Sequence, residues 1–404
     1  MPLRPFVDIA LIAASAPVVA WTGYLFTLTV MSRRDAPEPP PEPRLRFDIV
    51  VPAHNEEKNI ASTVRSLLAT DYPPEMRRVI VVADNCSDAT AERARAAGAT
   101  AIERKDPSRR GKGYALAFAF EHILREGVAD AVVVVDADSE VSPNFLRAFA
   151  GRFQAGAPAV QARYGVRNRE ASWRTRLMAI GLGAFHDLRS LGRERLGVSC
   201  GLRGNGMGFT RALLRDVPHD AFSIVEDVEY GIRLGRLGHR VWYVDEAEVL
   251  GEMVATEAES RSQRSRWEGG RWQLARKHGP KLLLDALRER KPLLLDLAMD
   301  MLVPPLSYIA LAAAAGTAVT AAAVVLGLAH PVVLVPWGMS VVFVGAYVAR
   351  GTVLSGAGWR GFVDLAAAPV YVTWKVALAA RGSKKKSAPQ GEWVRTARTG
   401  ERAP

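Results

Sequence analysis

Two aspartates lie two residues apart at the end of an apolar run, in the stretch VVVVDADSEV. The run predicts a buried β-strand, and residues two apart on a strand point to the same side. Asp136 and Asp138 therefore present neighbouring carboxylates, which would repel each other unless a cation lay between them. Such oxygen ligands suit Mg²⁺ or Mn²⁺, completed by the phosphates of a substrate. The residues alone leave open a solvated strand end, with Ser139 or Ser142 capping a helix.

Two further groups of residues could act on a hydroxyl and a diphosphate. Glu226 and Asp227 begin a stretch with helical spacing, where a carboxylate could serve as a general base. Acids at a helix N-terminus are also stabilised there without any catalytic role. Gln263, Arg266 and Trp267 are spaced to share one face of a helix. Arg266 could make two parallel hydrogen bonds to a diphosphate, and Trp267 offers a flat face to a sugar ring.

The elements that must position these groups begin at Phe47. Short apolar runs alternate there with stretches of helical periodicity, which predicts βαβ units and a mainly parallel sheet flanked by helices. Ligands of such sheets bind beyond the carboxyl ends of the strands. The expected strand ends are followed by VPAHNEE, ADNCSDAT and VDADSEV, so polar side chains gather where a ligand would bind.

Four segments in succession resemble glycosyltransferase family 2: VVPAHNEEKNIASTVRSLLATDYP, VIVVADNCSDATAERA, RGKGYALAFAF and VVVVDADSEVSPNFL. The segments GLRGNGMGFTR, SIVEDVEYGIRLGRLGHRV and QRSRW extend the resemblance over residues 47–272. The resemblance implies a GT-A-type fold with a mixed, mainly parallel sheet, and inverting transfer of a sugar from a nucleotide sugar, with a UDP-sugar as the expected donor.

The resemblance also implies roles for individual residues of the donor site. The residues that match the family's nucleotide-binding positions are Pro52, His54, Glu56, Asp84, Lys112 and Asp136. Asp84 matches the aspartate that contacts uracil, although Ala83 precedes it where many relatives have a second aspartate. Taken alone, Asp84 could cap a turn and Lys112 could be a helix-terminal lysine in a flexible loop.

For the reacting groups, the resemblance implies that Asp138, aided by Asp136, binds the divalent ion. Asp227 matches the catalytic base, with Glu226 orienting it, and Val225 stands where threonine is usual.

The acceptor side rests on a second resemblance. Gln263, Arg266 and Trp267 match the Gln-x-x-Arg-Trp signature of membrane-bound synthases of cellulose, chitin and hyaluronan. Gly204 and Asn205 match positions near the acceptor, where the alternative is a tight turn. The resemblance implies extension of a polysaccharide at the cytoplasmic membrane face. Ceramide glucosyltransferases carry a similar signature, so transfer of one sugar to a lipid is the alternative, and an inactive nucleotide-sugar-binding scaffold is a remote one.

Apolar segments at both ends predict attachment to the membrane. Phe6–Met31, Leu302–Ala329 and Pro331–Ala349 are long enough to cross a bilayer as helices. The residues 362–380 are interrupted by an acid, a proline and a lysine, so we expect them in the interface, with a third crossing as the alternative. Basic flanks, including Arg33–Arg34, place the polar domain in the cytoplasm of a multi-pass protein of the inner (plasma) membrane.

The predicted organisation has seven parts: an N-terminal helix (1–34), a proline-rich linker (35–46), the catalytic domain (47–260), the signature segment with an amphipathic interfacial helix (261–300), two spans (301–350), an interfacial or third spanning segment (351–381) and a basic tail (382–404). The net charge of +11 fits surfaces that face anionic lipid. Nucleic acid is not an expected partner, because no nucleic-acid-binding signature is present. The expected partners are a nucleotide sugar, a glycan or lipid acceptor and membrane lipids. For a polymer, a homo-oligomer or export partner would have to widen the narrow membrane part.

Overall fold

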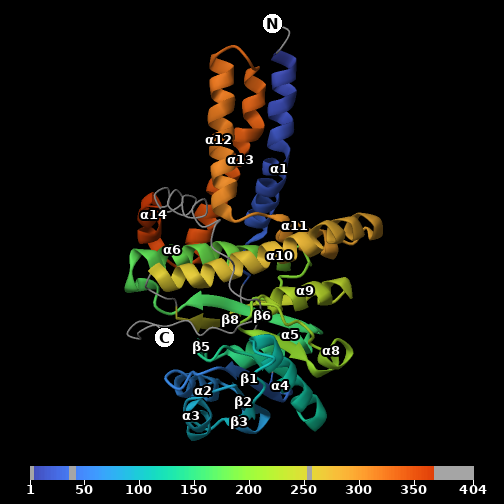
Figure 1. Ribbon diagram of the computed structural model, residues 1–404, viewed down its shortest axis with the longest axis vertical. Coiled ribbons are helices and arrows are strands. Elements are labelled where there is room, and N and C mark those ends of the chain that lie inside the picture. Colours follow the sequence, from blue (N-terminus) through green and yellow to red (C-terminus); the bar gives the residue numbers. More distant parts are fainter. Residues whose placement is uncertain (1–3, 36–41, 253–256, 368–404) are drawn as a thin grey trace.

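The computed structural model describes residues 4–35, 42–252 and 257–367, and leaves the side chains of residues 174 and 257–268 outside that description. Three long apolar helices form a bundle at one end, and a larger α/β body lies below it (Figure 1). A layer of helices that run across the bundle axis lies between the two parts.

One eight-stranded mixed sheet forms the centre of the α/β body, in the order β3-β2-β1-β4-β7-β6-β8-β5. The strands β1 to β4 run parallel, as the alternating pattern predicted, whereas β7 runs antiparallel to both of its neighbours. The strands are β1 (Phe47–Ala53), β2 (Arg77–Asp84), β3 (Thr100–Arg104), β4 (Ala131–Val134), β5 (Ser139–Val141), β6 (Ala159–Val166), β7 (Met207–Thr210) and β8 (Val241–Gly251). The predicted fold class is therefore confirmed.

Helices cover both faces of this sheet because its central strands are apolar on both sides. On β1, Val50 packs with residues of α4, whereas its neighbours Ile49 and Val51 pack with residues of α2 and α5. The helices of this part are α2 (Ile60–Leu68), α3 (Thr90–Ala96), α4 (Lys112–Glu126), α5 (Phe145–Gln154), α6 (Trp173–Leu182), α7 (Arg189–Arg195), α8 (Arg211–Asp216) and α9 (Glu226–Arg236). A π-helical segment, Gly183–Leu188, joins α6 to α7.

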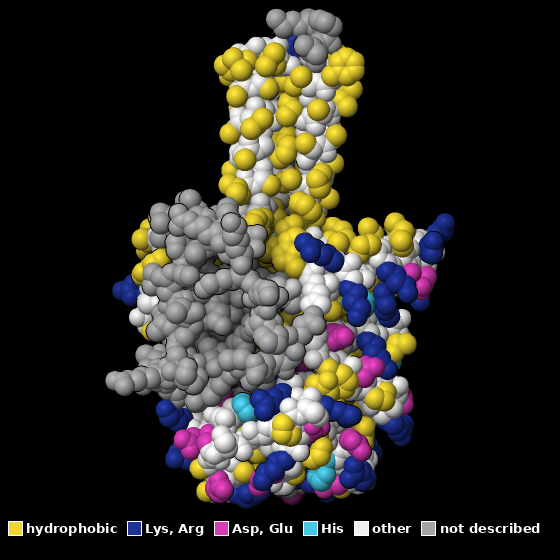
Figure 2. Space-filling view, viewed as in Figure 1, with side chains coloured by type: hydrophobic (Ala, Val, Ile, Leu, Met, Phe, Trp, Pro, Cys, Tyr) yellow, Lys and Arg dark blue, Asp and Glu magenta, His cyan; other side chains and the backbone are white. Residues whose placement is uncertain are grey.

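The remaining helices build the layer below the bundle and the bundle itself. They are α10 (Glu257–Glu289), α11 (Pro292–Leu302), α12 (Leu306–Val325), α13 (Leu334–Leu354), α14 (Gly358–Asp364) and the N-terminal α1 (Arg4–Met31). Among the described residues, α1, α12 and the segment Pro331–Leu354 are long and apolar enough to cross a membrane. Apolar side chains cover the bundle along its length, and Lys and Arg gather on the helices below (Figure 2). The expected interfacial segment is described only as far as residue 367, so its path and that of the basic tail lie outside the described residues.

The three apolar helices pack directly on one another. The rings of Phe26 on α1 and Phe343 on α13 stack with their centroids 4.2 Å apart. The hydroxyl of Thr22 donates to that of Ser340 over 3.3 Å in the interior of the bundle. Gly316 of α12 lies so close to the Trp337 ring that a side chain there would overlap it. Small and hydroxyl-bearing residues thus bring the helices into close contact, as is common in membrane bundles.

Buried charges join the bundle to the α/β body. Arg193 of α7 pairs with Asp296 of α11 at 2.7 Å, and Arg189 pairs with Asp300 at 3.1 Å. The hydroxyl of Tyr24 on α1 donates to Asp296 over 2.8 Å. Arginine and aspartate are rarely buried unless paired, so each element holds the others in a fixed register. We call these five residues, together with Arg271 of α10, the junction.

We predict that Arg193→Leu lowers the free energy of unfolding by about 3–5 kcal/mol, because it leaves Asp296 charged and buried without its cation. Thermal unfolding of the purified protein in detergent measures the change. The double variant Arg193→Leu/Asp296→Leu should recover much of the loss, and Arg288→Leu on the exposed end of α10 is the control. An unchanged transition in Arg193→Leu would show that the junction contributes no stability.

Candidate active site

A buried asparagine holds the loop that carries the two aspartates. The backbone N–H of Asp136 donates to Asn205 Oδ1 over 3.1 Å, and Asn205 Nδ2 donates to the Ser139 hydroxyl over 2.8 Å. Asn205 is only 1% exposed. Asn205 thus positions the aspartate loop from a buried place with both amide atoms hydrogen-bonded, and its predicted acceptor contact stays a prediction.

Lys112, the first residue of α4, lies among the acids. Its ammonium group forms an ion pair with Asp136, donates to the carbonyl oxygen of Gly204 over 2.5 Å and lies 3.9 Å from Glu226 Oε1. Burial works against its charge, but Asp136 and Glu226 outweigh that effect and raise the pKa of Lys112. Close packing fixes this position: a side chain at Gly113 would meet the carbonyl oxygen of Ala221, just before α9.

Glu226 and Asp227 begin α9, as the sequence predicted, and face Lys112. Burial raises the pKa of Glu226 to about 8, with Lys112 opposing the shift and Asp227 adding to it. Burial also raises the pKa of Asp227, against the backbone N–H of Val228 and the Lys112 ammonium. The pair therefore shares less negative charge at neutral pH than two ordinary carboxylates would.

Gly204 leaves space beside this pair. A Cβ atom at this position would lie 3.4 Å from Asp227 Oδ2 and 3.6 Å from Lys112 Nζ. The residue has φ +78°, a conformation that favours glycine. Gly204 thus lets a ligand approach the Asp227 carboxylate closely, which fits its predicted place near the acceptor.

The expected nucleobase contact, Asp84, lies at the end of β2 and is 1% exposed. Arg104 of β3 pairs with Asp84 Oδ1 at 2.6 Å, while Asp84 Oδ2 is buried without a hydrogen-bond partner among the described residues. A buried acceptor without a partner is costly, so it suits an N–H donor from a bound base. Arg104 is not among the site residues predicted from the sequence, although its place at the end of a parallel strand beside β2 is a signal for it.

The other predicted nucleotide-binding residues surround the end of β1. The His54 ring nitrogen Nδ1 lies 2.7 Å from the carbonyl oxygen of Asp84. Glu56 accepts a hydrogen bond from Asn59 Nδ2 over 3.0 Å, and its N–H donates to the Thr90 hydroxyl over 2.8 Å. These contacts fix the β1–α2 turn against the start of α3. Pro52 is buried within β1, where it pairs with β2. The nucleotide contacts of these residues stay a prediction.

Asp136 and Asp138 fit a divalent ion that is only partly held by protein. Both are partly exposed at the carboxyl end of β4, and Asp138 accepts a hydrogen bond from the Ser139 hydroxyl over 3.2 Å. No group of three or more His, Cys, Asp or Glu side chains converges as a metal site in the described part of the chain. Two carboxylates leave most positions of Mg²⁺ or Mn²⁺ open for substrate phosphates, which is common for such ions.

The predicted signature residues Gln263, Arg266 and Trp267 lie on α10, and their side chains are outside the described part. The same helix reaches the acids one turn later: a Cβ atom at Gly270 would lie 3.1 Å from the methyl groups of Val225, the residue before Glu226. The backbone of α10 therefore passes directly over the start of α9, which fits the predicted placement of the signature beside the catalytic acids.

Comparison with known proteins decides the family. The family model described as "Glycosyltransferase like family 2" matches residues 43–270, more than half of the chain. The chain belongs to this glycosyltransferase family. It is 30% identical over 236 residues to the beta-monoglucosyldiacylglycerol synthase of Synechocystis, which covers 56% of this chain and 47% of the relative.

Two further proteins are similar to the chain. The probable glycosyltransferase YdaM of Bacillus subtilis is 25% identical over 234 residues, 56% of this chain and 55% of the relative. The chain thus spans about half the length of these two relatives. The mannosyltransferase PcManGT of Pyrobaculum calidifontis, solved with GDP-Man and Mn²⁺, superimposes with a TM-score of 0.54 at 21% identity, over 86% of this chain and 97% of that one. This likeness shows that the GT-A-like fold is shared.

We predict that kcat/KM for sugar transfer rises with pH through a pKa above the ordinary carboxylate value of about 4. Asp227 must lose its proton to act as a base, and burial raises its pKa. Glu226→Gln removes the acid that lies beside Asp227, so the rise should move to lower pH. Initial rates between pH 5 and pH 9, with the exposed Glu121→Gln as control, test this. An unmoved profile in Glu226→Gln would contradict the electrostatic link between the two acids.

Proposed function

We propose that the protein transfers one sugar from a nucleotide sugar, with a UDP-sugar the expected donor, to a lipid acceptor in the membrane. The observation that carries this proposal is the direct packing of α1, α12 and α13, whose side chains meet in the interior of the bundle. A bundle of this kind leaves no room for a glycan along its axis. The Synechocystis relative is named for a glucosylated diacylglycerol, which supports a lipid acceptor.

The site supports direct displacement with inversion at the anomeric carbon. The Asp84 oxygen that has no hydrogen-bond partner among the described residues accepts an N–H from the nucleobase, and Lys112 turns from Asp136 towards the diphosphate. Asp138 and Asp136 would hold Mg²⁺ or Mn²⁺, which supplies positive charge for the departing diphosphate. Asp227 takes the proton of the acceptor hydroxyl while the acceptor oxygen bonds to the anomeric carbon. The bond from that carbon to the diphosphate oxygen breaks, and the nucleoside diphosphate leaves with the electron pair.

The same proposal includes the placement in the cell. The three apolar helices span the inner membrane, and the basic flank Arg33–Arg34 keeps the catalytic domain in the cytoplasm, where nucleotide sugars are made. In this placement, α10 lies at the membrane surface as an amphipathic helix.

Polysaccharide synthesis is the second candidate, because Gln263, Arg266 and Trp267 match the signature of polymer synthases and lie on a helix beside the acids. It requires an export path that the described helices of one chain do not provide. A homo-oligomer or a partner protein would then have to form the channel.

The test is a panel of UDP- and GDP-sugars with Mg²⁺ or Mn²⁺, offered to the protein in lipid vesicles, with release of nucleotide and size of product measured. We expect Asp227→Asn to lower kcat by about 10²–10⁴-fold, because the proton of the acceptor loses its base. The exposed Asp216→Asn is the matched control. Full activity of Asp227→Asn would remove the base assignment, and a product that grows by many sugars would overturn the single-transfer proposal.

A further inference from the structure

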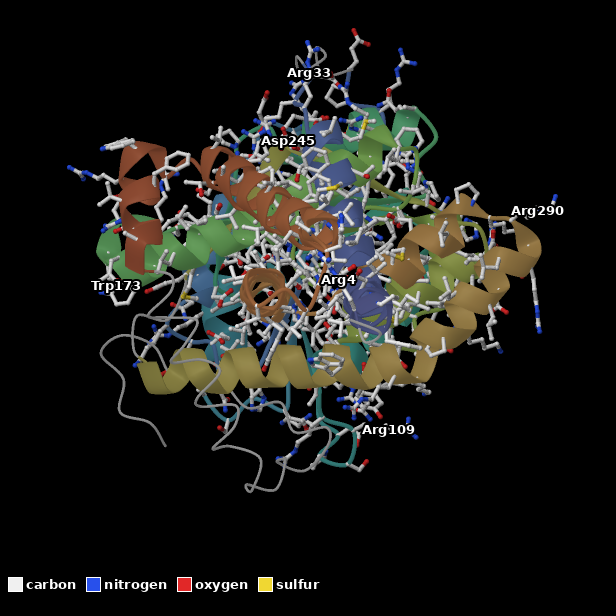
Figure 3. All side chains as sticks on the ribbon, turned by 90° about the horizontal axis from the view of Figure 1, so that it is seen from above. Arg4, Arg33, Arg109, Trp173, Asp245 and Arg290 are labelled. Carbon is white, nitrogen blue, oxygen red and sulfur yellow. The ribbon has the colours of Figure 1, made fainter. Side chains whose placement is uncertain are left out.

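A cavity of about 1010 Å³ lies where the apolar bundle meets α10. Seen along the bundle axis, α10 runs along one side of the upright helices (Figure 3). The residues that line the cavity come from α1, from α10 and from the start of α12 with the turn before it: Trp21, Gly269, Trp272, Gln273, Arg276, Lys277, Pro304, Tyr308, Ile309 and Ala312.

The two walls of this cavity differ in chemistry. The wall from α1 and α12 is apolar, with Trp21, Ile309 and Ala312. The wall from α10 bears Arg276 and Lys277, and none of the described residues that line the cavity is acidic. An apolar wall beside a cationic one is complementary to an amphiphile with a negatively charged head.

Exposed aromatic side chains lie at the boundary between the two walls. Trp272 is 43% exposed and Tyr308 is 36% exposed, although both are large. Tryptophan and tyrosine favour the level of lipid headgroups, where one part of the ring is apolar and the other is wet. The Arg276 guanidinium lies 5.9 Å from the Trp272 ring centroid. The cavity is therefore placed at the depth where a headgroup meets its acyl chains.

Two glycines of α10 separate this cavity from the catalytic acids. Gly269 lines the cavity, and a Cβ atom there would meet nothing within 4 Å. Its neighbour Gly270 contacts Val225, which precedes Glu226 and Asp227. At these two positions α10 bears no side chain, so its backbone alone lies between the cavity and Val225 there. A headgroup hydroxyl could pass here from the cavity to the base.

We propose that this cavity holds the acceptor, a two-chain lipid with an anionic headgroup that carries a free hydroxyl. The acyl chains lie against α1 and α12, the negative charge pairs with Arg276 and Lys277, and the hydroxyl reaches Asp227 past Gly269. The assignment rests on the proposed single transfer to a lipid. It adds where the lipid binds and which class of headgroup it carries. A neutral diacylglycerol would leave the two cations unpaired.

Photolabelling tests the seat without any catalysis. The full chain in phosphatidylcholine vesicles is mixed with a phosphatidylglycerol that carries a diazirine on one acyl chain, irradiated and digested. We expect labelled peptides from α1 around Trp21 and from α12 around Tyr308, and unlabelled phosphatidylglycerol should compete better than diacylglycerol. Labels spread evenly over α1, α12 and α13 would overturn the cavity as a specific site.

Matched variants test the headgroup and the passage. Arg276→Glu/Lys277→Glu should lower transfer to phosphatidylglycerol about tenfold or more, because two favourable contacts become repulsive. Arg288→Glu/Arg290→Glu makes the same charge change at the far end of α10, where Arg290 points away from the body (Figure 3), and should change little. Gly269→Phe should block transfer, whereas Gly345→Phe, an equally open glycine on α13, should not. Unchanged transfer in both cavity variants would overturn the proposal.

The outcomes separate this proposal from the one on which it rests. Gly269→Phe and Arg276→Glu/Lys277→Glu could both make glycosylated lipid at the full rate. This result would support the single-transfer function and contradict the cavity as the binding site of the acceptor. Competed labelling of the cavity, with a growing polymer and no glycosylated lipid, would remove the single-transfer function and the acceptor role together. Equal transfer to diacylglycerol and to phosphatidylglycerol would overturn the anionic headgroup.

Discussion

Two aspartates of α11 are buried among arginines from α7 and α10, and the placement of the catalytic domain under the bundle depends on them. Asp300 pairs with Arg189 and, at 3.1 Å, with Arg271, so one carboxylate joins three helices. Burial alone would raise the pKa of Asp300, but the surrounding arginines outweigh it and hold that pKa well below its usual value. The carboxylate therefore stays charged. Once these charges are away from water, the stable arrangement is the one that pairs them, and this restricts how the elements can move against one another.

The same region leads to the active site. The guanidinium groups of Arg189, Arg203 and Arg271 lie 4.7, 4.9 and 5.0 Å from the Phe185 ring centroid. Arg203 directly precedes Gly204, and its charge also acts on Asp227 by lowering that pKa against the effect of burial. Phe185 thus brings two arginines of the junction together with Arg203, whose charge acts on Asp227. Because α10 contributes Arg271 to the junction and Gly270 to the contact with Val225, one helix links the base of the bundle to the start of α9.

Much of this structure could be predicted from local sequence. The apolar strands of the parallel half of the sheet, the helical start at Glu226 and the acids at the end of β4 each follow from short-range periodicity. The three apolar helices follow from length and composition. The positions of the donor-site residues around the ends of β1, β2 and β4 follow from a general property of parallel sheets, whose carboxyl ends share one edge.

What could not be predicted depends on contacts between distant parts of the chain. Tyr24 and Asp296 are 272 residues apart, and no periodicity relates them. In the sequence, Asn205 is indistinguishable from a residue of a glycine-rich turn. Its side-chain amide lies beside the aspartate loop because β7 pairs antiparallel with β4. The glycine pair of α10 could not be interpreted from the sequence either. Glycines inside a helix lower its stability, and the sequence shows no gain that offsets this. The use of the pair becomes visible only when Val225 lies on one side of it and an open cavity on the other. Residues that act on a ligand only through such long-range contacts have no recognisable pattern in the local sequence. Residues at strand ends can be recognised, because the apolar strand before them is visible in the sequence.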